Sequence, residues 1–201
     1  PGGDLNDPVV QSTLRVVKVF WSLEDKLAFR RHFPAISWLN SYSLYSGTLA
    51  EAMNRLAGTE FAEEASRAMA LLEQEAALEE IVRLVGKDTL SPQDRLTLEV
   101  ARSIREDFLH QNAFHEVDTY ASLAKQALML SAILRFHDLA RQALERGADA
   151  NELEQMPVRE RLARMKYLAE HEARDAITDI VRQLERELPS APTSSAATEA
   201  P

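Results

Sequence analysis

The sequence contains no cysteine, and this absence removes several kinds of chemistry at once. Without thiols, the 201-residue chain forms no disulfide, no thiolate metal site and no cysteine nucleophile. This composition fits a reducing, cytoplasmic setting. Its six glycines build neither a GxGxxG turn nor a GxxxxGK[ST] phosphate loop. No apolar run approaches the roughly 18 residues that a membrane span needs, and no signal-peptide pattern is present, so we expect no direct membrane insertion.

The sequence also has fewer basic residues than acidic ones. The chain carries 23 Lys and Arg against 32 Asp and Glu, a formal net charge of −9. A nucleic-acid binder requires a basic surface to neutralise phosphates, so this balance argues against a nucleic-acid partner. Hydrophobic residues make up 45% of the chain, which is enough for a sizeable globular core. Because the chain starts at "PGGD" without a methionine, we expect it to be part of a longer protein.

The N-terminal segment has a mixed strand and helix pattern. β-Branched and aromatic residues crowd positions 16–21 and predict one buried strand. Residues 24–33 suit a short helix that Pro34 ends. A single strand cannot satisfy its own backbone groups. We therefore expect residues 1–46 to be the edge fragment of an α/β domain whose other strands lie outside the chain.

From residue 47 onward, the apolar residues have the three- and four-residue spacing of amphipathic helices. The first helix of this part is expected to end at Gly86. Ser91 then has the position of an N-cap, with Pro92 in the first turn and Asp94 as the acid of a capping box. The apolar face of the next helix comprises Leu96, Val100, Ile104 and Phe108.

A further long helix is predicted over residues 119–146, because Gly147 follows as a stop signal. One or two more helices follow and are interrupted or kinked at Pro157. The last segment, residues 189–201, lacks large apolar side chains and is expected to be disordered. The chain is thus predicted to be mostly α, with a C-terminal antiparallel helical bundle over residues 47–188 after the α/β edge fragment.

No self-contained catalytic centre is apparent. The five histidines are scattered along the chain, and "HEVDTY" is not an HExxH zinc motif, so neither a metal site nor a catalytic residue is predicted. Most acidic residues lie on polar helix faces, where a solvated surface is the simplest interpretation. Arg30 and Arg31 lie beside aromatic residues and suit either a phosphate contact or, more often, an ordinary surface pair.

Aromatic residues gather where the periodicity is weakest. Residues 30–47 are the least periodic part of the first half of the chain, yet they contain four of the 13 aromatic residues. Phe33 lies before Pro34 at a break between elements, and Phe114 lies in the polar break "QNAFHE". A ring at a loop position gains little unless it packs against something. Each phenylalanine is therefore either an ordinary core residue or a stacking surface for a flat ligand such as a nucleobase.

Two long segments are distinctive: "GGDLNDPVVQSTLRVVKVFWSLEDKLAFRRHFPAISWLNSYSLY" and "LVGKDTLSPQDRLTLEVARSIREDFLHQNAFHEVDTY". Both resemble the catalytic A subunit of V-type and A-type rotary ATPases. The resemblance continues in the same order from Pro1 to about Leu188. The segments "ARQALERG" and "MPVRERLARMKYL" favour the bacterial A/V-type ATP synthase branch. Residues 1–46 would then be the C-terminal edge of the family's nucleotide-binding domain.

The resemblance implies a role for the loop aromatics, which in this family pack against the adenine of ATP or ADP. The residues expected on the adenine side are Phe33, Pro34, Asn112, Ala113 and Phe114. The family's phosphate loop, Mg²⁺ contacts and general base lie upstream of the matched segments. The full-length subunit is therefore expected to use ATP or ADP with Mg²⁺. This chain alone is expected to be inactive and to hold no cofactor tightly.

The resemblance also implies partners. B subunits alternate with A subunits in an A3B3 ring and supply an arginine finger, and a central rotor stalk runs through the ring. This headpiece is peripheral to the membrane and couples ATP hydrolysis or synthesis to H⁺ or Na⁺ transport. The rival interpretation is a non-catalytic helical interaction protein derived from the same subunit.

Rotor contact is expected at the turn between the first two helices of the bundle. This turn comprises Gly86, Lys87, Asp88, Thr89, Leu90, Ser91, Pro92, Gln93 and Asp94. The related F-type β subunit carries an acidic run at this place, whereas the present turn has only one net negative charge. A steric push on the rotor is therefore favoured over an electrostatic grip.

Overall fold

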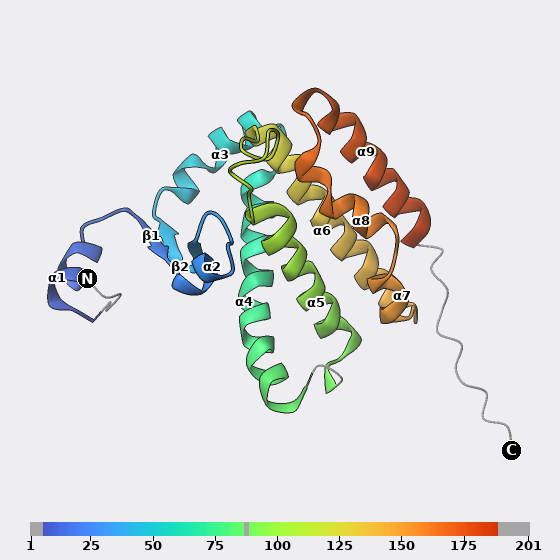
Figure 1. Ribbon diagram of the computed structural model, residues 1–201, viewed down its shortest axis with the longest axis horizontal. Coiled ribbons are helices and arrows are strands. Elements are labelled where there is room, and N and C mark those ends of the chain that lie inside the picture. The colour runs from blue at the N-terminus through green and yellow to red at the C-terminus, as the bar shows by residue number, and fades with distance from the viewer. Residues whose placement is uncertain (1–5, 87–88, 189–201) are drawn as a thin grey trace, which may run out of the picture.

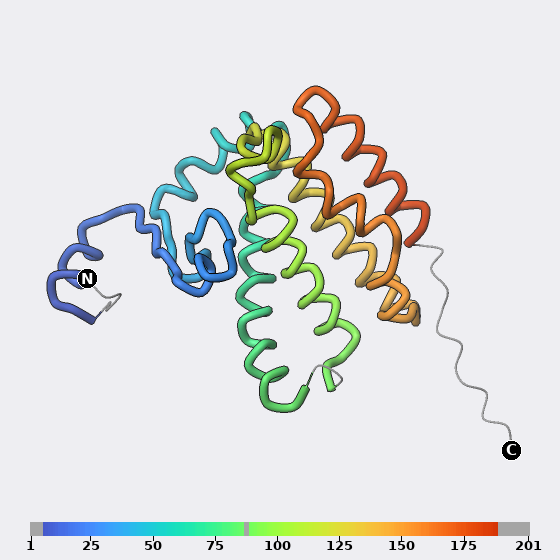
Figure 2. The backbone as a smooth tube through the Cα atoms, in the orientation of Figure 1, coloured from blue at the N-terminus to red at the C-terminus, as the bar shows by residue number. Residues whose placement is uncertain are grey.

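A computed structural model describes residues 6–86 and 89–188 and places most of them in helices packed side by side (Figure 1, Figure 2). The helices form a bundle, and an arm that contains the two strands extends from one side of it. This arrangement confirms the predicted, mostly α fold. The helix nearest the N-terminus lies at the far end of the arm, and the last helix lies on the opposite side of the bundle (Figure 2). The segment 189–201, predicted to be disordered, lies outside the described residues.

The arm, residues 6–45, begins with helix α1 (Pro8–Leu14). Asp7 caps this helix, because its side chain accepts hydrogen bonds from the backbone N–H groups of Val9 and Val10. The other elements of the arm are β1 (Val19–Leu23), α2 (Asp25–Phe29) and β2 (Ile36–Ser43). The short helix predicted before Pro34 is thus confirmed as α2.

The predicted strand, β1, pairs with a second strand of the same chain. The expectation that all of its partner strands lie outside the chain was therefore wrong. β1 and β2 pair antiparallel, with Val19 opposite Ser43 and Leu23 opposite Ile36. β2 lies in the segment that showed no clear period, because Leu39 and Asn40 break the alternation of apolar and polar residues in the middle of the strand. Strand formation depends on the fit of side chains to a pleated, half-buried surface, which residue type alone does not reveal.

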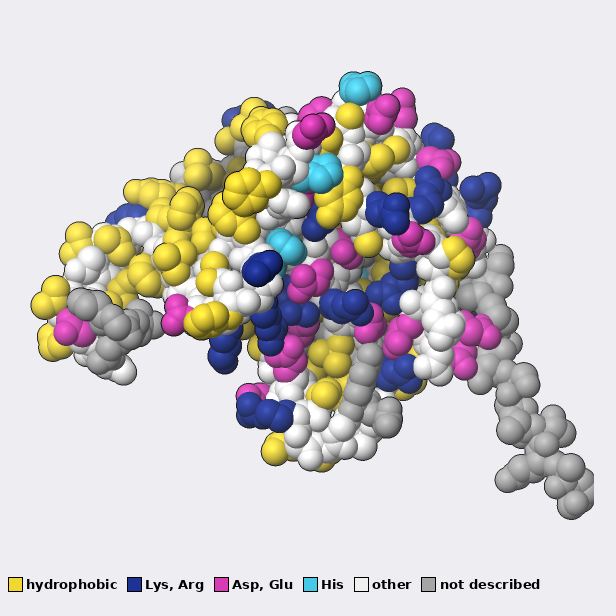
Figure 3. Space-filling view, viewed as in Figure 1, with side chains coloured by type: hydrophobic (Ala, Val, Ile, Leu, Met, Phe, Trp, Pro, Cys, Tyr) yellow, Lys and Arg dark blue, Asp and Glu magenta, His cyan; other side chains and the backbone are white. Residues whose placement is uncertain are grey.

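The arm exposes many apolar side chains, which gather over one side of the space-filling view (Figure 3). Trp21, Leu23 and Phe29 are 70%, 77% and 87% exposed. The strand that was predicted to be buried is therefore largely exposed, because two strands alone provide little cover for such side chains. By contrast, Trp38 of β2 packs against the core of the bundle and attaches the arm to it. This pattern is the one expected of an edge fragment of a larger α/β domain.

The bundle begins with α3 (Ser46–Ala57) and α4 (Phe61–Val85) rather than with one continuous helix. Gly58 separates them with a left-handed backbone, at φ +74°, which favours glycine. The side chain of Asn54 accepts a hydrogen bond from the backbone of Ala62 and spans the break. A helical hydrophobic pattern continued across Gly58, so the spacing alone did not reveal the turn.

The helix after the α4 turn confirms the predicted capping pattern. In α5 (Pro92–Ser103), the Ser91 hydroxyl accepts a bond from the backbone N–H of Asp94 and donates to its carboxylate at 2.7 Å. A π-helical segment, η2 (Ile104–Leu109), continues α5. Helix α6 (Leu123–Glu145) starts later than predicted, because Ser122 is its N-cap.

Four short or amphipathic elements complete the bundle. They are α7 (Ala150–Glu154), α8 (Val158–Ala163), the 3₁₀ turn η3 (Met165–Tyr167) and α9 (Glu170–Glu187). Pro157 precedes α8, where its missing N–H costs nothing, instead of kinking a longer helix. The core is built around α6, and its most deeply buried side chains include Val100, Ile104, Leu130, Ile133, Leu134, Ile177 and Leu184.

A matched pair of leucine truncations tests this core. Leu134 in α6 is 1% exposed, so Leu134→Ala should lower the free energy of unfolding by about 2–5 kcal/mol through lost burial and a residual cavity. Leu56 in α3 is 73% exposed, so Leu56→Ala should change it by less than about 0.5 kcal/mol. Urea denaturation followed by circular dichroism measures both. Equal effects of the two substitutions would contradict this placement of the core.

Candidate functional site

Two loops from distant parts of the chain lie against each other beside the sheet. We call residues 30–35, between α2 and β2, the Phe33 loop, and residues 110–122, between η2 and α6, the Phe114 loop. The backbone N–H of Gln111 donates a hydrogen bond of 2.7 Å to the carbonyl oxygen of Phe33. This bond joins the two segments that the resemblance assigned to one adenine site.

The Phe33 loop presents an aromatic ring that is partly open to solvent. Arg31 has a positive φ of 58°, and the backbone N–H of His32 donates to the carbonyl oxygen of Leu27. His32 is buried, whereas Phe33 is 51% exposed. The peptide bond between Phe33 and Pro34 is cis. The loop therefore turns His32 inward and leaves the phenylalanine at the surface.

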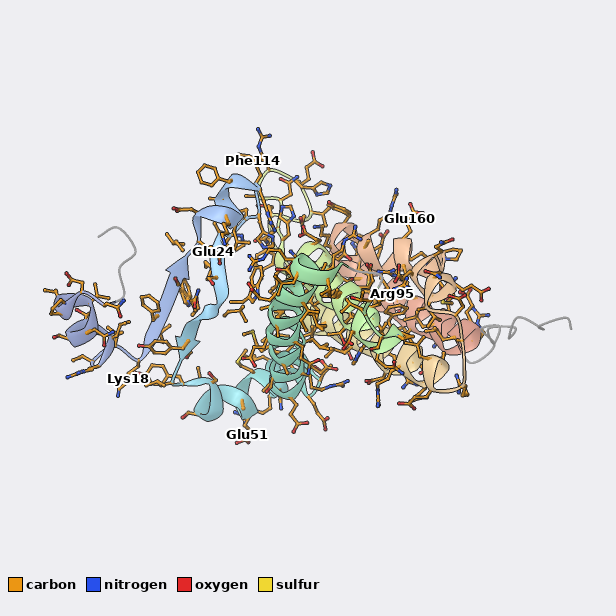
Figure 4. All side chains as sticks on the ribbon, turned by 90° about the horizontal axis from the view of Figure 1, so that it is seen from below. Lys18, Glu24, Glu51, Arg95, Phe114 and Glu160 are labelled. Atoms are coloured by element: carbon orange, nitrogen blue, oxygen red, sulfur yellow. The ribbon has the colours of Figure 1, made fainter. Side chains whose placement is uncertain are left out.

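The Phe114 loop holds its ring entirely in solvent. Phe114 is 100% exposed and projects at the periphery, beside the end of the two-stranded sheet (Figure 4). The loop backbone is nevertheless fixed. The buried Asp118 carboxylate accepts from the N–H of Asn112, and the Asn112 side chain accepts from the N–H of Phe114. Phe114 is therefore not a core residue of the described part of the chain.

Two lysines hold backbone carbonyls at the start of the Phe114 loop and in the neighbouring η3 segment. The ammonium group of Lys166 donates to the carbonyl oxygens of Glu106 and His110, at 2.8 and 3.1 Å. The ammonium group of Lys125 donates to the carbonyl oxygens of Lys166 and Leu168, at 2.9 and 2.7 Å. Burial lowers the pKa of Lys125. These tethers satisfy carbonyl groups that the helix ends leave open.

Sequence reasoning missed both lysines as functional groups. Lys125 lies among the apolar residues of α6 and is 2% exposed, which is unusual for a lysine. A lysine on an otherwise apolar helix face was the only feature of the sequence that could have indicated this role. The distant carbonyl partners were not visible in the sequence, because they depend on how η2 and η3 pack.

A pair of histidines meets next to the bond between the loops, since His32 precedes Phe33 and His110 precedes Gln111. The rings of His32 and His110 stack with their centroids 4.9 Å apart, and His32 also contacts Trp38 at 5.6 Å. The Glu106 carboxylate lies 3.7 Å from Nδ1 of His110. Burial, and to a lesser extent the neighbouring His110, lowers the pKa of His32. The interpretation of the histidines as scattered was therefore wrong for these two.

The predicted rotor turn lies at the end of the bundle remote from α3 and the Phe114 loop (Figure 1). Gly86 ends α4 with a positive φ of 89°, and its carbonyl oxygen accepts from the Thr89 hydroxyl. Two of the predicted contact residues, Lys87 and Asp88, lie outside the described residues. The adjoining helix end exposes three apolar side chains, which are Ile81, Leu84 and Val85.

Two family models match the chain. Residues 50–155 match the model described as the C-terminal domain of V and A type ATP synthase. Residues 1–43 match the ATP synthase alpha/beta family, nucleotide-binding domain. No helix among the described residues is long and apolar enough to cross a membrane.

Individual relatives agree with these matches. The chain is 61% identical over 170 residues to a V-type ATP synthase alpha chain of Thermoanaerobacter sp. (strain X514), covering 85% of this chain and 29% of the relative. It is 54% identical over 188 residues to V-type ATP synthase alpha chain 1 of Clostridium tetani, covering 94% of this chain and 32% of the relative. The chain thus spans about a third of the length of the curated relatives it matches.

A solved structure shares the fold. The ATP synthase subunit NeqB from Nanoarcheaum equitans superposes with a TM-score of 0.57 at 21% identity, over 68% of this chain and 32% of that chain. At this identity the match supports the architecture alone. The evidence for the relationship is therefore the sequence matches. Both relatives described above are bacterial, as the resemblance indicated. The chain therefore belongs to the family of V- and A-type ATP synthase alpha chains, of which it carries the C-terminal domain.

Proposed function

We propose that this chain forms the adenine side of an ATP- or ADP-binding site in the catalytic subunit of a V/A-type ATP synthase, and that its helical bundle passes motion from that site to a rotor. The observation that carries the proposal is the bond between the backbones of Gln111 and Phe33. It brings two solvent-exposed aromatic residues, Phe33 and Phe114, onto adjoining loops. The match of residues 1–43 to a nucleotide-binding domain favours this function over that of a non-catalytic interaction protein.

The exposed rings suit a nucleobase because every base presents a flat π-face that an aromatic side chain can cover. A phenylalanine in water loses no packing when a base stacks on it and gains buried apolar area. Pro34, Asn112 and Ala113 flank the rings and complete the proposed adenine contacts. The phosphates and Mg²⁺ would be held by residues upstream of this segment in the full-length subunit.

The proposed assembly follows from the same family. In it, B subunits alternate with this subunit in an A3B3 ring, and a central stalk passes through the ring as part of a headpiece peripheral to the membrane. The turn after α4 would contact that stalk. The exposed Leu84 and Val85 beside this turn support a contact made through shape and apolar surface.

Replacing the loop aromatics in the intact subunit tests the adenine contact. Stacking contributes about 1–3 kcal/mol per aromatic residue, so Phe33→Ala or Phe114→Ala should weaken ATP binding roughly tenfold or more. Tyrosine should substitute well and leucine only in part, because leucine restores area without a π-face. Phe29→Ala is the control, since Phe29 is 87% exposed but lies in neither loop. Nucleotide titration measures all variants, and equal performance of leucine and tyrosine would contradict stacking.

The isolated chain should be folded yet catalytically silent. The helical core is contained within the described residues, so far-ultraviolet circular dichroism should show a cooperative helical protein. Phosphoryl transfer depends on positioning the γ-phosphate and Mg²⁺, which we assign to upstream residues. A phosphate-release assay on the purified chain should therefore detect no Mg²⁺-dependent ATP hydrolysis. ATP hydrolysis that persists through purification would contradict the assignment of the phosphate and Mg²⁺ contacts to upstream residues.

Variants of the α4–α5 turn separate a steric push from an electrostatic grip. Lys87→Ala, Asp88→Ala and Asp94→Asn combined should leave torque largely intact, because exposed ion pairs contribute about 0–1 kcal/mol. Asparagine is chosen at Asp94 because this carboxylate is bonded to the Ser91 cap. Leu84→Ser with Val85→Ser should reduce torque while ATP hydrolysis persists. Single-molecule rotation under viscous load measures both, and the opposite ranking would refute the steric push.

A further inference from the structure

Two histidines and a glutamate from distant parts of the chain meet beside the bond that joins the loops. His32 precedes Phe33, while Glu106 lies in η2 and His110 directly follows η2. Each residue offers one ligand atom, and the three atoms lie within 4.8 Å of one another. We infer that His32, Glu106 and His110 form a binding site for a divalent transition-metal ion of the zinc class.

The donor set decides which ions fit. Proteins bind Zn²⁺ with two imidazoles and one carboxylate, leaving a fourth position to water. Imidazole nitrogen also suits Co²⁺, Ni²⁺ and Cu²⁺, whereas Mg²⁺ and Ca²⁺ prefer oxygen ligands throughout. The proposed ion is therefore different from the Mg²⁺ that accompanies ATP.

The ligands are held in place before any ion arrives. His32 is 7% exposed and packs between the rings of His110 and Trp38. Among the described residues, no hydrogen bond occupies the ring nitrogens of His32. One oxygen of Glu106 lies 3.7 Å from Nδ1 of His110, and the other lies 3.6 Å from the Arg105 guanidinium. The carboxylate is thus oriented by Arg105 with one oxygen toward the histidines.

Backbone geometry explains how one short segment supplies two ligands. In η2 the N–H of His110 donates to the carbonyl oxygen of Arg105, five residues earlier, at 2.8 Å. Such π-helical turns are rare in proteins, and those that occur are frequently at functional sites. It brings the side chains of Glu106 and His110 to the same side as the Phe33 loop.

Two cationic side chains lie near the three proposed ligands and limit the affinity of the site for a metal ion. Arg105 is paired with the buried carboxylate of Glu75 at 3.2 Å, and the Lys166 ammonium is engaged by two backbone carbonyls. Both cations are thus already paired with groups outside the two histidines. Their repulsion nevertheless opposes a further positive charge, so we expect reversible rather than permanent metal binding.

An ion at this site would connect the arm to the bundle. His32 belongs to the arm, and the other two ligands belong to the segment that leads into the Phe114 loop. Metal binding would therefore hold the two aromatic loops at a constant separation. This consequence does not depend on nucleotide binding and can be tested without it.

Calorimetric titration of the 201-residue chain with Zn²⁺ tests the site. We expect one ion per chain, and an excess of Mg²⁺ should not displace it. Loss of an outer-shell partner alone costs about 10–100-fold in metal affinity, so His32→Gln and His110→Gln should each weaken binding at least about tenfold. His171→Gln is the matched control, because His171 is an exposed histidine with a glutamate neighbour, Glu172, at 3.5 Å. Equal binding by all variants, or no saturable binding, would overturn the proposal.

A fluorescence measurement keeps the test decisive if a histidine variant fails to fold. The chain has two tryptophans, and Trp38 contacts His32 whereas Trp21 is exposed in β1. In a Trp21→Phe background, Co²⁺ should therefore quench the remaining tryptophan and saturate at one equivalent. An unchanged signal at saturating Co²⁺ would overturn the site.

Discussion

The backbone hydrogen bond from Gln111 to the Phe33 carbonyl holds together the part of the molecule to which we assign function. The two loops that it joins carry the exposed aromatic rings of Phe33 and Phe114 and the stacked imidazoles of His32 and His110. At 2.7 Å, this bond fixes the separation of the two loops at the point where Phe33 and Gln111 meet. Nearby, Lys166 and Lys125 donate hydrogen bonds to backbone carbonyls of η2, of the loop's first residue and of η3, which tie these segments together.

The same support links the loops to the far end of the bundle. α5 begins at the capped turn and continues through η2 into the Phe114 loop, so one continuous helical segment has the proposed nucleotide contact at one end and the proposed rotor contact at the other (Figure 1). Val100 and Ile104 are fully buried along this segment. Close-packed interiors resist local deformation, and a displacement at one end of such a segment is passed on as a movement of the whole helix.

Local signals in the sequence predicted much of this arrangement. The Ser91 cap, the helix end at Gly86 and the buried face around Val100 follow from capping chemistry and helical spacing, which act within a few residues. Long-range features were not predicted. The pairing of β1 with β2 and the meeting of His32 with His110 depend on contacts between segments far apart in the chain. The break at Gly58 was missed because the hydrophobic pattern is continuous across it.

The claim that the Phe114 ring meets adenine can be tested directly by fluorescence in the intact subunit. Phe114→Trp places an indole at the position that is 100% exposed in the described chain, in a background with Trp21→Phe and Trp38→Phe. If a base stacks on this side chain, ADP should quench the emission, with a midpoint equal to the dissociation constant measured independently. Nucleotide binding of normal affinity without any change in this emission would contradict the adenine contact.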